Sequence, residues 1–301
     1  MAQTPICESI LIADCGAVAT KVALVDRVGG DFRLIGIART PTTAEPPVSD
    51  ISTGVRRAIR QLETLAGRPM LTGEGELIAP ETQEGSGVDA FVAVTSAAAP
   101  LRAVVVGLSR DQSVAFAQRA LAGTSVIVQE TVAVDEESGR WGTNAKDGVG
   151  GGPSVAVEQV LALQPDLIVM TGGTDGGASA PLVELANIVA CIAQALDPAN
   201  RPVVVFAGNR DARAAVAERI GSTTEFRATE NIMPRLKAEN FRPLQDEVQA
   251  VQFERKVKAL PGLDKLVSWS ARPLTSALAA SERVVEFLAK RHNLRVQALE
   301  T

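Results

Sequence analysis

A short stretch near the N-terminus, Ala13–Lys21 (ADCGAVATK), has residue types that suit phosphate chemistry. It lies between two apolar runs, SILIA and VALVD, so the pattern predicts a hairpin with Asp14 at the end of a buried strand. A turn at Gly16 directs successive backbone N–H groups into a concavity that binds an anion. Asp14 would then hold Mg²⁺ through a water molecule rather than contact phosphate directly. The alternative, that Gly16 only makes the turn, stays open.

Two glycine-rich turns later in the chain are also candidates for ligand binding. TGGTDGG at 171–177 follows the apolar run DLIVM, and GNRD at 208–211 follows RPVVVFAG. Neighbouring parallel strands place their carboxyl ends at one crevice, and the following helix N-termini favour anions, so both turns are expected to share a ligand site. In the alternative reading, each turn is a tight strand-to-helix connection, with a side chain such as Asp175 or Ser179 as the cap. The candidate nucleotide-binding residues of these turns are Gly172, Gly173, Asp175, Gly176, Gly177, Gly208 and Asn209.

Several common kinds of site are excluded because the sequence motifs that they require do not occur in the chain. The chain has no G-K-[ST] phosphate loop and no G-x-G-x-x-G followed by a ribose-binding acid, which disfavours a Rossmann-type dinucleotide enzyme. His292 is the single histidine, so a multi-histidine metal site is excluded. The three cysteines, Cys7, Cys15 and Cys191, show no C-x-x-C spacing, which favours a reduced, cytoplasmic setting.

The composition and charge of the chain argue against nucleic acid as a partner and against a membrane-spanning segment. The net charge of −5 and the pI near 5.2 argue against nucleic-acid binding. Aromatic residues make up 3% of the chain, so the core must consist mainly of Val, Leu, Ile and Ala. The most apolar helix-like run, at 181–196, carries Glu184 and is short for a bilayer span. No membrane-spanning segment is therefore expected.

The elements that would position the first turn are three strands and a helix. SILIAD, TKVALVD and FRLIGIART read as a β-meander, with Gly29 and Gly30 in the second hairpin turn. The helix that follows, at 51–66, places apolar residues on one face; Ser49, Asp50 or Ser52 is its candidate cap, and Gly67 its stop.

From about residue 88 the pattern changes to alternating strands and helices. Short apolar strands separated by helices predict a parallel sheet with right-handed crossovers, followed by a mostly helical C-terminal part. The fold class is therefore α/β, with expected domains at 1–85, 86–230 and 231–301. The segment 136–154 holds many glycines and is expected to be a surface loop or an inserted arm, with no assigned role.

Taken together, these motifs resemble the glutamate mutase L (MutL) family of the actin–hexokinase–Hsp70 ATPase superfamily. The resemblance lies in ILIADCGAVATKVALVD, TPTTAEPP with GVRRAIRQLE, GSGVDAFVAVTSAAAPLRAVVVGLSRD, PDLIVMTGGTDGG, VVVFAGNRDARAAV and ENIMPRL. These stretches follow one another in the expected order over nearly the whole chain.

The resemblance implies an actin-like (ribonuclease H-like) first lobe at 1–85 and the cofactors ATP and Mg²⁺. It also implies an accessory or chaperone-like role towards adenosylcobalamin-dependent glutamate mutase. On this reading Asp14 organises the metal, and Gly16 and Thr20 belong to the first phosphate loop. An oligomer is expected, and so is a companion chain or lobe that completes the fold, because the second phosphate loop of such ATPases, D-x-G-G-[AT]-T, does not occur in the 301 residues.

The first phosphate loop departs from the family pattern. The family has hydroxyl residues after the glycine, whereas this chain has Ala17, Val18 and Ala19. Each lost hydrogen bond to a charged phosphate removes about 1.5–3 kcal/mol. The expectation is a nucleotide-binding accessory protein with weak or no ATPase activity. The alternative is a non-catalytic structural or assembly subunit that keeps the fold and has lost ATP binding.

Overall fold

The computed structural model describes residues 7–135, 140–142 and 153–294. The chain separates into two compact units, one made of residues 1–99 and 253–301 and the other of residues 100–252. In the part of the chain that the structure describes, no helix is long and apolar enough to cross a membrane.

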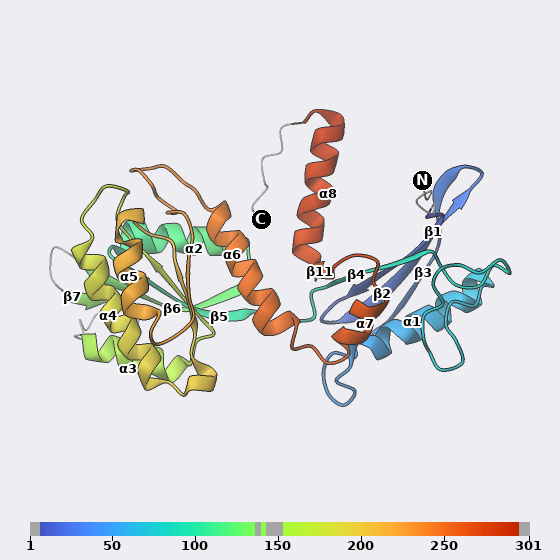
Figure 1. Ribbon diagram of the computed structural model, residues 1–301, viewed down its shortest axis with the longest axis horizontal. Helices are drawn as coiled ribbons and strands as arrows, with labels where there is room; N and C mark the ends of the chain where they lie inside the picture. The colour runs from blue at the N-terminus through green and yellow to red at the C-terminus, as the bar shows by residue number, and fades with distance from the viewer. Residues whose placement is uncertain (1–6, 136–139, 143–152, 295–301) are drawn as a thin grey trace. The chain divides into compact units, whose positions relative to one another are not determined.

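A five-stranded mixed sheet forms the framework of the first unit (Figure 1). Its first three strands are the predicted meander, in which β1 pairs antiparallel with β2 and β2 pairs antiparallel with β3. The strand β4 then pairs parallel with β1, and the short β11 pairs parallel with β4. The strands are β1 Ser9–Cys15, β2 Ala19–Val28, β3 Asp31–Pro41, β4 Ala90–Thr95 and β11 Thr275–Ser276.

The helix α1 (Ile51–Ala66) covers one face of this sheet. Asp50 caps it by accepting the N–H groups of Ser52 and Thr53, and Gly67 ends it in the left-handed conformation with φ 66°. Both features match the sequence-based candidates. The buried side of α1 shares one core with β1, β2, β4 and α7 (Leu263–Trp269). The last helix, α8 (Ala277–His292), has no buried side chain.

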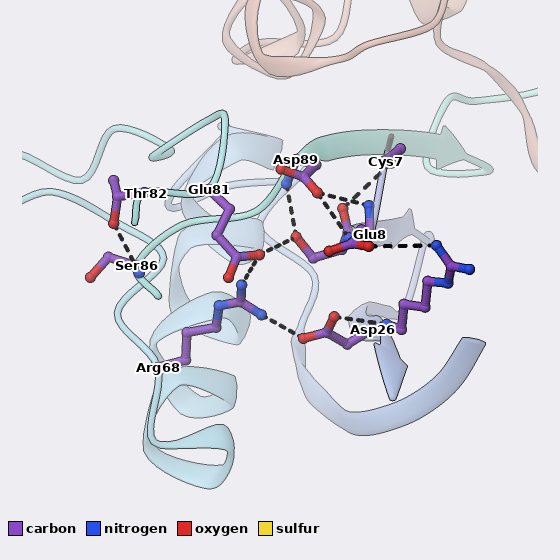
Figure 2. A network of polar contacts seen from close by, with 10 residues as sticks. Cys7, Glu8, Asp26, Arg68, Glu81, Thr82, Ser86 and Asp89 are labelled. Carbon is purple, nitrogen blue, oxygen red and sulfur yellow. Dashed lines mark hydrogen bonds and ion pairs between the residues drawn. The ribbon is translucent and has the colours of Figure 1, made fainter. Parts of the chain in front are cut away.

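Polar side chains join the amino end of β1 to the segments around it (Figure 2). Arg68, just after α1, forms ion pairs with Asp26 of β2 and with Glu81. The Ser9 hydroxyl donates to Glu81, and Asp89 accepts the N–H groups of Glu8 and Ser9. This network therefore fixes the ends of the strands that lie opposite the β1–β2 turn.

The second unit is a doubly wound sheet of six strands in the order β10-β9-β8-β5-β6-β7. All neighbouring pairs are parallel except β6 with β7. The helices lie on both faces (Figure 1): α3, α4 and α5 belong to one core, and α2 and α6 to the other. The strands are β5 Leu101–Gly107, β6 Val126–Asp135, β7 Arg140–Gly142, β8 Leu167–Thr171, β9 Val203–Phe206 and β10 Phe226–Ala228. The helices are α2 Ala115–Ala122, α3 Pro153–Leu163, α4 Ala180–Ala195, α5 Arg213–Ile220 and α6 Arg242–Gln252.

The α/β class is confirmed, as one mixed sheet and one largely parallel sheet with helices. The compact units differ from the expected division at 1–85, 86–230 and 231–301. The strand β4 was expected to open the α/β part, yet it pairs with β1, and α6 packs with the second unit. Within the expected loop 136–154, residues 140–142 form β7; residues 136–139 and 143–152 lie outside the described part.

Candidate functional site

The turn between β1 and β2 is tight and exposed. The Gly16 N–H donates to the Ala19 carbonyl oxygen at 3.0 Å, and a Cβ on Gly16 would lie only 2.8 Å from the same oxygen. Glycine is therefore required by the close approach of the backbone. At the tip, Ala17 and Val18 are exposed, Val18 by 78%. Their N–H groups have no acceptor among the residues that the structure describes, so this turn presents two backbone donors to solvent.

Asp14 lies directly opposite Lys21 in the β1–β2 hairpin. The Lys21 Nζ is 3.8 Å from the Asp14 Oδ2, and both side chains are well exposed. Among the described residues, no group of three or more His, Cys, Asp or Glu side chains gathers into a metal-binding cluster. Asp14 therefore offers one carboxylate, with a lysine beside it, next to the open turn.

Thr20 points away from that turn. Its side chain is buried, and its hydroxyl oxygen lies beneath α1, where a Cβ on Gly54 would approach it to 3.0 Å. Successive side chains of a strand alternate between the two faces, so Thr20 shares the core face with Val22 and Leu24. Only the backbone of Thr20 can serve the predicted phosphate loop.

The loop after β4 lies beside the turn, because β4 runs parallel to β1. The Thr95 hydroxyl and the Ser96 N–H both donate to the Cys15 carbonyl oxygen, at 2.9 and 3.0 Å. The Ser96 side chain is exposed, and its Oγ would lie 3.8 Å from a Cβ on Gly16. A hydroxyl thus stands next to the turn although positions 17–19 carry none. The sequence around Ser96 gives little sign of this, because the serine is followed by three alanines and a proline.

Cys15, which precedes the turn, is chemically quiet. Burial, and to a smaller extent the charge of Asp14, raises the pKa of its thiol to about 12. The thiolate is the reactive form of cysteine. Cys15 therefore stays protonated at neutral pH and acts as a small apolar core residue.

The two glycine turns of the second unit lie side by side at the carboxyl ends of β8 and β9. Gly172, Gly173 and Gly176 have positive φ angles of 146°, 67° and 82°. Gly208 lies against the backbone of Gly172, where a Cβ would be 2.8 Å from the carbonyl oxygen. These glycines allow the two turns to pack closely on each other.

The polar residues of these turns are already engaged with one another. The Asp175 carboxylate accepts the Arg210 N–H at 3.1 Å and the Asn231 amide at 2.9 Å. Asn209, fully buried, donates to the Gly177 carbonyl oxygen at 2.9 Å. Gly176 donates to Asp211 at 2.9 Å. Asp175 and Asn209 therefore shape the turns, which fits the connector reading as well as a ligand site.

The strand order of the second unit defines one further position of interest. From β5 the chain passes to β6 on one side, whereas β8, β9 and β10 follow on the other, so the order reverses between β5 and β8. Open α/β sheets bind ligands outside the carboxyl ends of the strands at such a point. The turn at 172–177 follows β8 and lies next to this reversal point, where a Cβ on Gly172 would be 2.7 Å from the side chain of Leu108, which follows β5.

The candidate residues thus fall into two groups. Asp14, Gly16 and Thr20 belong to the first unit, and Gly172, Gly173, Asp175, Gly176, Gly177, Gly208 and Asn209 belong to the second. Sequence reasoning missed two participants. Lys21 could have been found by counting the hairpin register from Gly16, whereas Asn231 is distant in sequence from the turn that it contacts.

Comparisons with known proteins agree with these motifs. The family model described as "MutL protein" matches residues 10–299. A curated relative, Protein MutL of Clostridium tetanomorphum, is 26% identical over 284 residues, which are 92% of this chain and 52% of the relative. The chain thus spans about half the length of that relative. Because the match covers nearly the whole chain, the resemblance is confirmed, and the chain belongs to the MutL protein family.

Proposed function

We propose that this chain is a nucleotide-binding accessory protein that holds the phosphates of MgATP weakly and has little or no ATPase activity of its own. The observation that carries the proposal is the pair of exposed N–H groups at Ala17 and Val18, without acceptors in the described chain, in a turn that requires Gly16. Backbone donors arranged in succession attract anions. The order of the first sheet, an antiparallel meander followed by parallel strands, supports the actin-like fold that accompanies such a loop.

The low affinity follows from the side chains of the turn. Positions 17–19 supply no hydroxyl, and the Thr20 hydroxyl is buried beneath α1. Each hydrogen bond to a charged group contributes about 1.5–3 kcal/mol, so restoring one raises affinity by about tenfold or more. Lys21 supplies a positive charge near the turn, and Asp14 would hold Mg²⁺ through water. Both are exposed enough to rearrange around a ligand.

The cellular role comes from the family. We propose that the chain is cytoplasmic and associates with an adenosylcobalamin-dependent mutase. Nucleotide binding would then regulate its accessory role towards that enzyme. A companion chain or lobe would supply the second phosphate loop. The glycine turns at 172–177 and 208–209 are proposed as a further ligand-contacting surface, and the position of 172–177 beside the strand-order reversal supports this.

A structural or assembly subunit is the second candidate function. It is favoured by the side chain of Val18, which is 78% exposed at the tip of the turn. An exposed valine suits a protein contact better than a phosphate site. In this case the fold persists and MgATP does not bind.

Calorimetric titration with MgATP distinguishes the two functions. The natural chain is compared with a variant carrying Ala17→Ser, Val18→Thr and Ala19→Thr. The matched control is Val28→Thr, the same kind of change at an exposed valine near the other hairpin of the sheet. The proposal expects weak binding by the natural chain, at least tenfold tighter binding by the triple variant, and no gain in the control.

The second candidate function expects no heat of binding from the natural chain. In a phosphate-release assay on the same samples, both candidate functions expect no appreciable ATP turnover from any of them. Rapid ATP hydrolysis by the natural chain would contradict the accessory role proposed for it.

A further inference from the structure

The strand β3 is a long, free edge of the first sheet. It has 11 residues, and in the described chain it pairs with β2 alone (Figure 1). An edge strand presents a row of backbone N–H and C=O groups that can pair with another strand. Edges in natural proteins are usually short or strongly charged. The length of β3 is therefore the first sign of a partner.

Its side chains are unusually apolar for an exposed edge. Four of them form a surface that we call the β3 patch: Phe32, Leu34, Ile35 and Ile37, exposed by 56%, 58%, 42% and 55%. Apolar side chains scattered singly over a surface need no explanation, but a continuous set marks an interaction site. This patch follows the edge itself, where a partner strand would add.

The register shows which face carries the patch. Phe32, Leu34 and Ile37 lie opposite Arg27, Val25 and Ala23 of β2. The helix α1 packs on the other face, where a Cβ on Gly36 would lie 3.0 Å from Leu62. The pairing shifts between Leu24 and Val25, which leaves Ile35 as the extra residue. Three apolar residues of the patch therefore lie on the face away from α1.

We propose that β3 pairs antiparallel with β3 of a second copy of this chain, which joins the two sheets across a two-fold axis. In an antiparallel pair of this kind, the α1 faces of the two sheets lie on the same side. Residues on the face away from α1 in one copy therefore pair with residues on that same face of the other copy. The shift at Ile35 makes this possible. It brings Leu34 of one copy opposite Ile37 of the other, and Phe32 opposite Arg39.

The charges select this register. Arg39 is an exposed residue on the same face, and here its guanidinium meets the ring of Phe32, which is a favourable cation–aromatic contact. Arg33 lies opposite Ala38, so no like charges face each other. A slip by two residues in one direction moves Arg39 beyond the end of the partner's strand, opposite Gly30. A slip by two residues in the other direction places Gly36 of one copy opposite Ile37 of the other, and these two residues lie on different faces of the sheet.

Sedimentation velocity of the full chain tests the association. The natural chain should form a dimer at concentrations up to about 100 µM, a range that detects even weak association. The double variant Leu34→Lys with Ile37→Lys should sediment as a monomer. The matched control is Leu65→Lys, at an exposed leucine of α1, and it should still dimerise. A natural chain that stays monomeric, or a double variant that dimerises as well as the natural chain, overturns the proposal.

Cysteine cross-linking tests the register independently. In a background with Cys7→Ser and Cys191→Ser, a Leu34→Cys chain is mixed with an Ile37→Cys chain and oxidised gently. The proposal expects a disulfide between the two different chains and little between copies of either one. Predominant cross-linking of identical chains overturns it. Both tests are independent of MgATP, so their failure is separate from failure of the proposed function.

Discussion

Replacing Gly54 by alanine tests how closely α1 packs on the strand that carries Thr20. A Cβ at this position would lie 2.9 Å from the Thr43 hydroxyl oxygen and 3.0 Å from the Thr20 hydroxyl oxygen. Thr43 cannot turn aside freely, because it donates to the Asp50 carbonyl oxygen at 2.6 Å and accepts the Gly54 N–H at 2.8 Å. The methyl group therefore meets fixed atoms.

Two opposing effects set the size of the change. Alanine favours a helix over glycine by about 1 kcal/mol. Overpacking a close contact costs about 1–3 kcal/mol, and moving α1 away would weaken the hydrogen bonds that Gly54 makes with Thr43 and Thr40, each contributing about 1 kcal/mol. We expect a net loss of about 1–3 kcal/mol in the free energy of unfolding of the first unit.

Urea unfolding measures this loss. A Trp141→Phe background leaves Trp269, which packs edge-on to Phe91 with ring centroids 5.8 Å apart, as the fluorescent reporter of the first unit. The control Thr64→Ala, at an exposed position of α1, should change stability by no more than about 0.5 kcal/mol. If Gly54→Ala instead stabilises the unit by about 1 kcal/mol, helix propensity alone decides, and the close packing described here is wrong.

Two further predictions concern the polar networks. Partial burial opposes ionisation of Asp89, but N–H donors from Glu8, Ser9 and Glu81 outweigh it and lower the Asp89 pKa (Figure 2). The stabilising effect of ionised Asp89 is therefore complete above the unfolded pKa of about 3.9 and is lost as the pH falls through the lowered folded pKa. Below about pH 4, the stability of Asp89→Asn should depend less on pH than that of the natural chain. Equal pH dependence of the two proteins would contradict this. In the second unit, Asn209→Ala removes a fully buried side chain together with its two hydrogen bonds and should cost about 1–3 kcal/mol in urea unfolding, whereas a loss below about 0.5 kcal/mol would show that the two turns do not depend on this side chain.

Local features of the first unit could be predicted from the sequence because they depend on neighbouring residues. The meander follows from alternating apolar residues, and the limits of α1 follow from Asp50 and Gly67. The burial of Thr20 was also within reach. Side chains alternate along β2, so Thr20 lies on the same face as Val22 and Leu24, and its hydroxyl belongs to the core and not to the turn.

Long-range pairing was beyond such reasoning. The run at 90–95 reads like any short strand of an α/β unit, and only its partner, β1, assigns it to the first sheet. The strand β11 has two residues, too few to give a pattern. In the second unit, Asn231 contacts the 172–177 turn from a distance of more than 50 residues in the chain. Local residue types do not encode these contacts, which depend on how the elements pack.

The most direct test of the proposed function observes the backbone donors themselves. Labelling alanine with ¹³C at the carbonyl and valine with ¹⁵N selects the N–H groups of Ala–Val sequences in an NMR spectrum, and the signal of Val18 is identified by its loss in Ala17→Ser. On titration with MgATP we predict a saturable shift of the Val18 N–H signal, while that of Val251, in a buried part of α6, stays unchanged. A Val18 signal that does not move at saturating MgATP would contradict the claim that this turn binds phosphate.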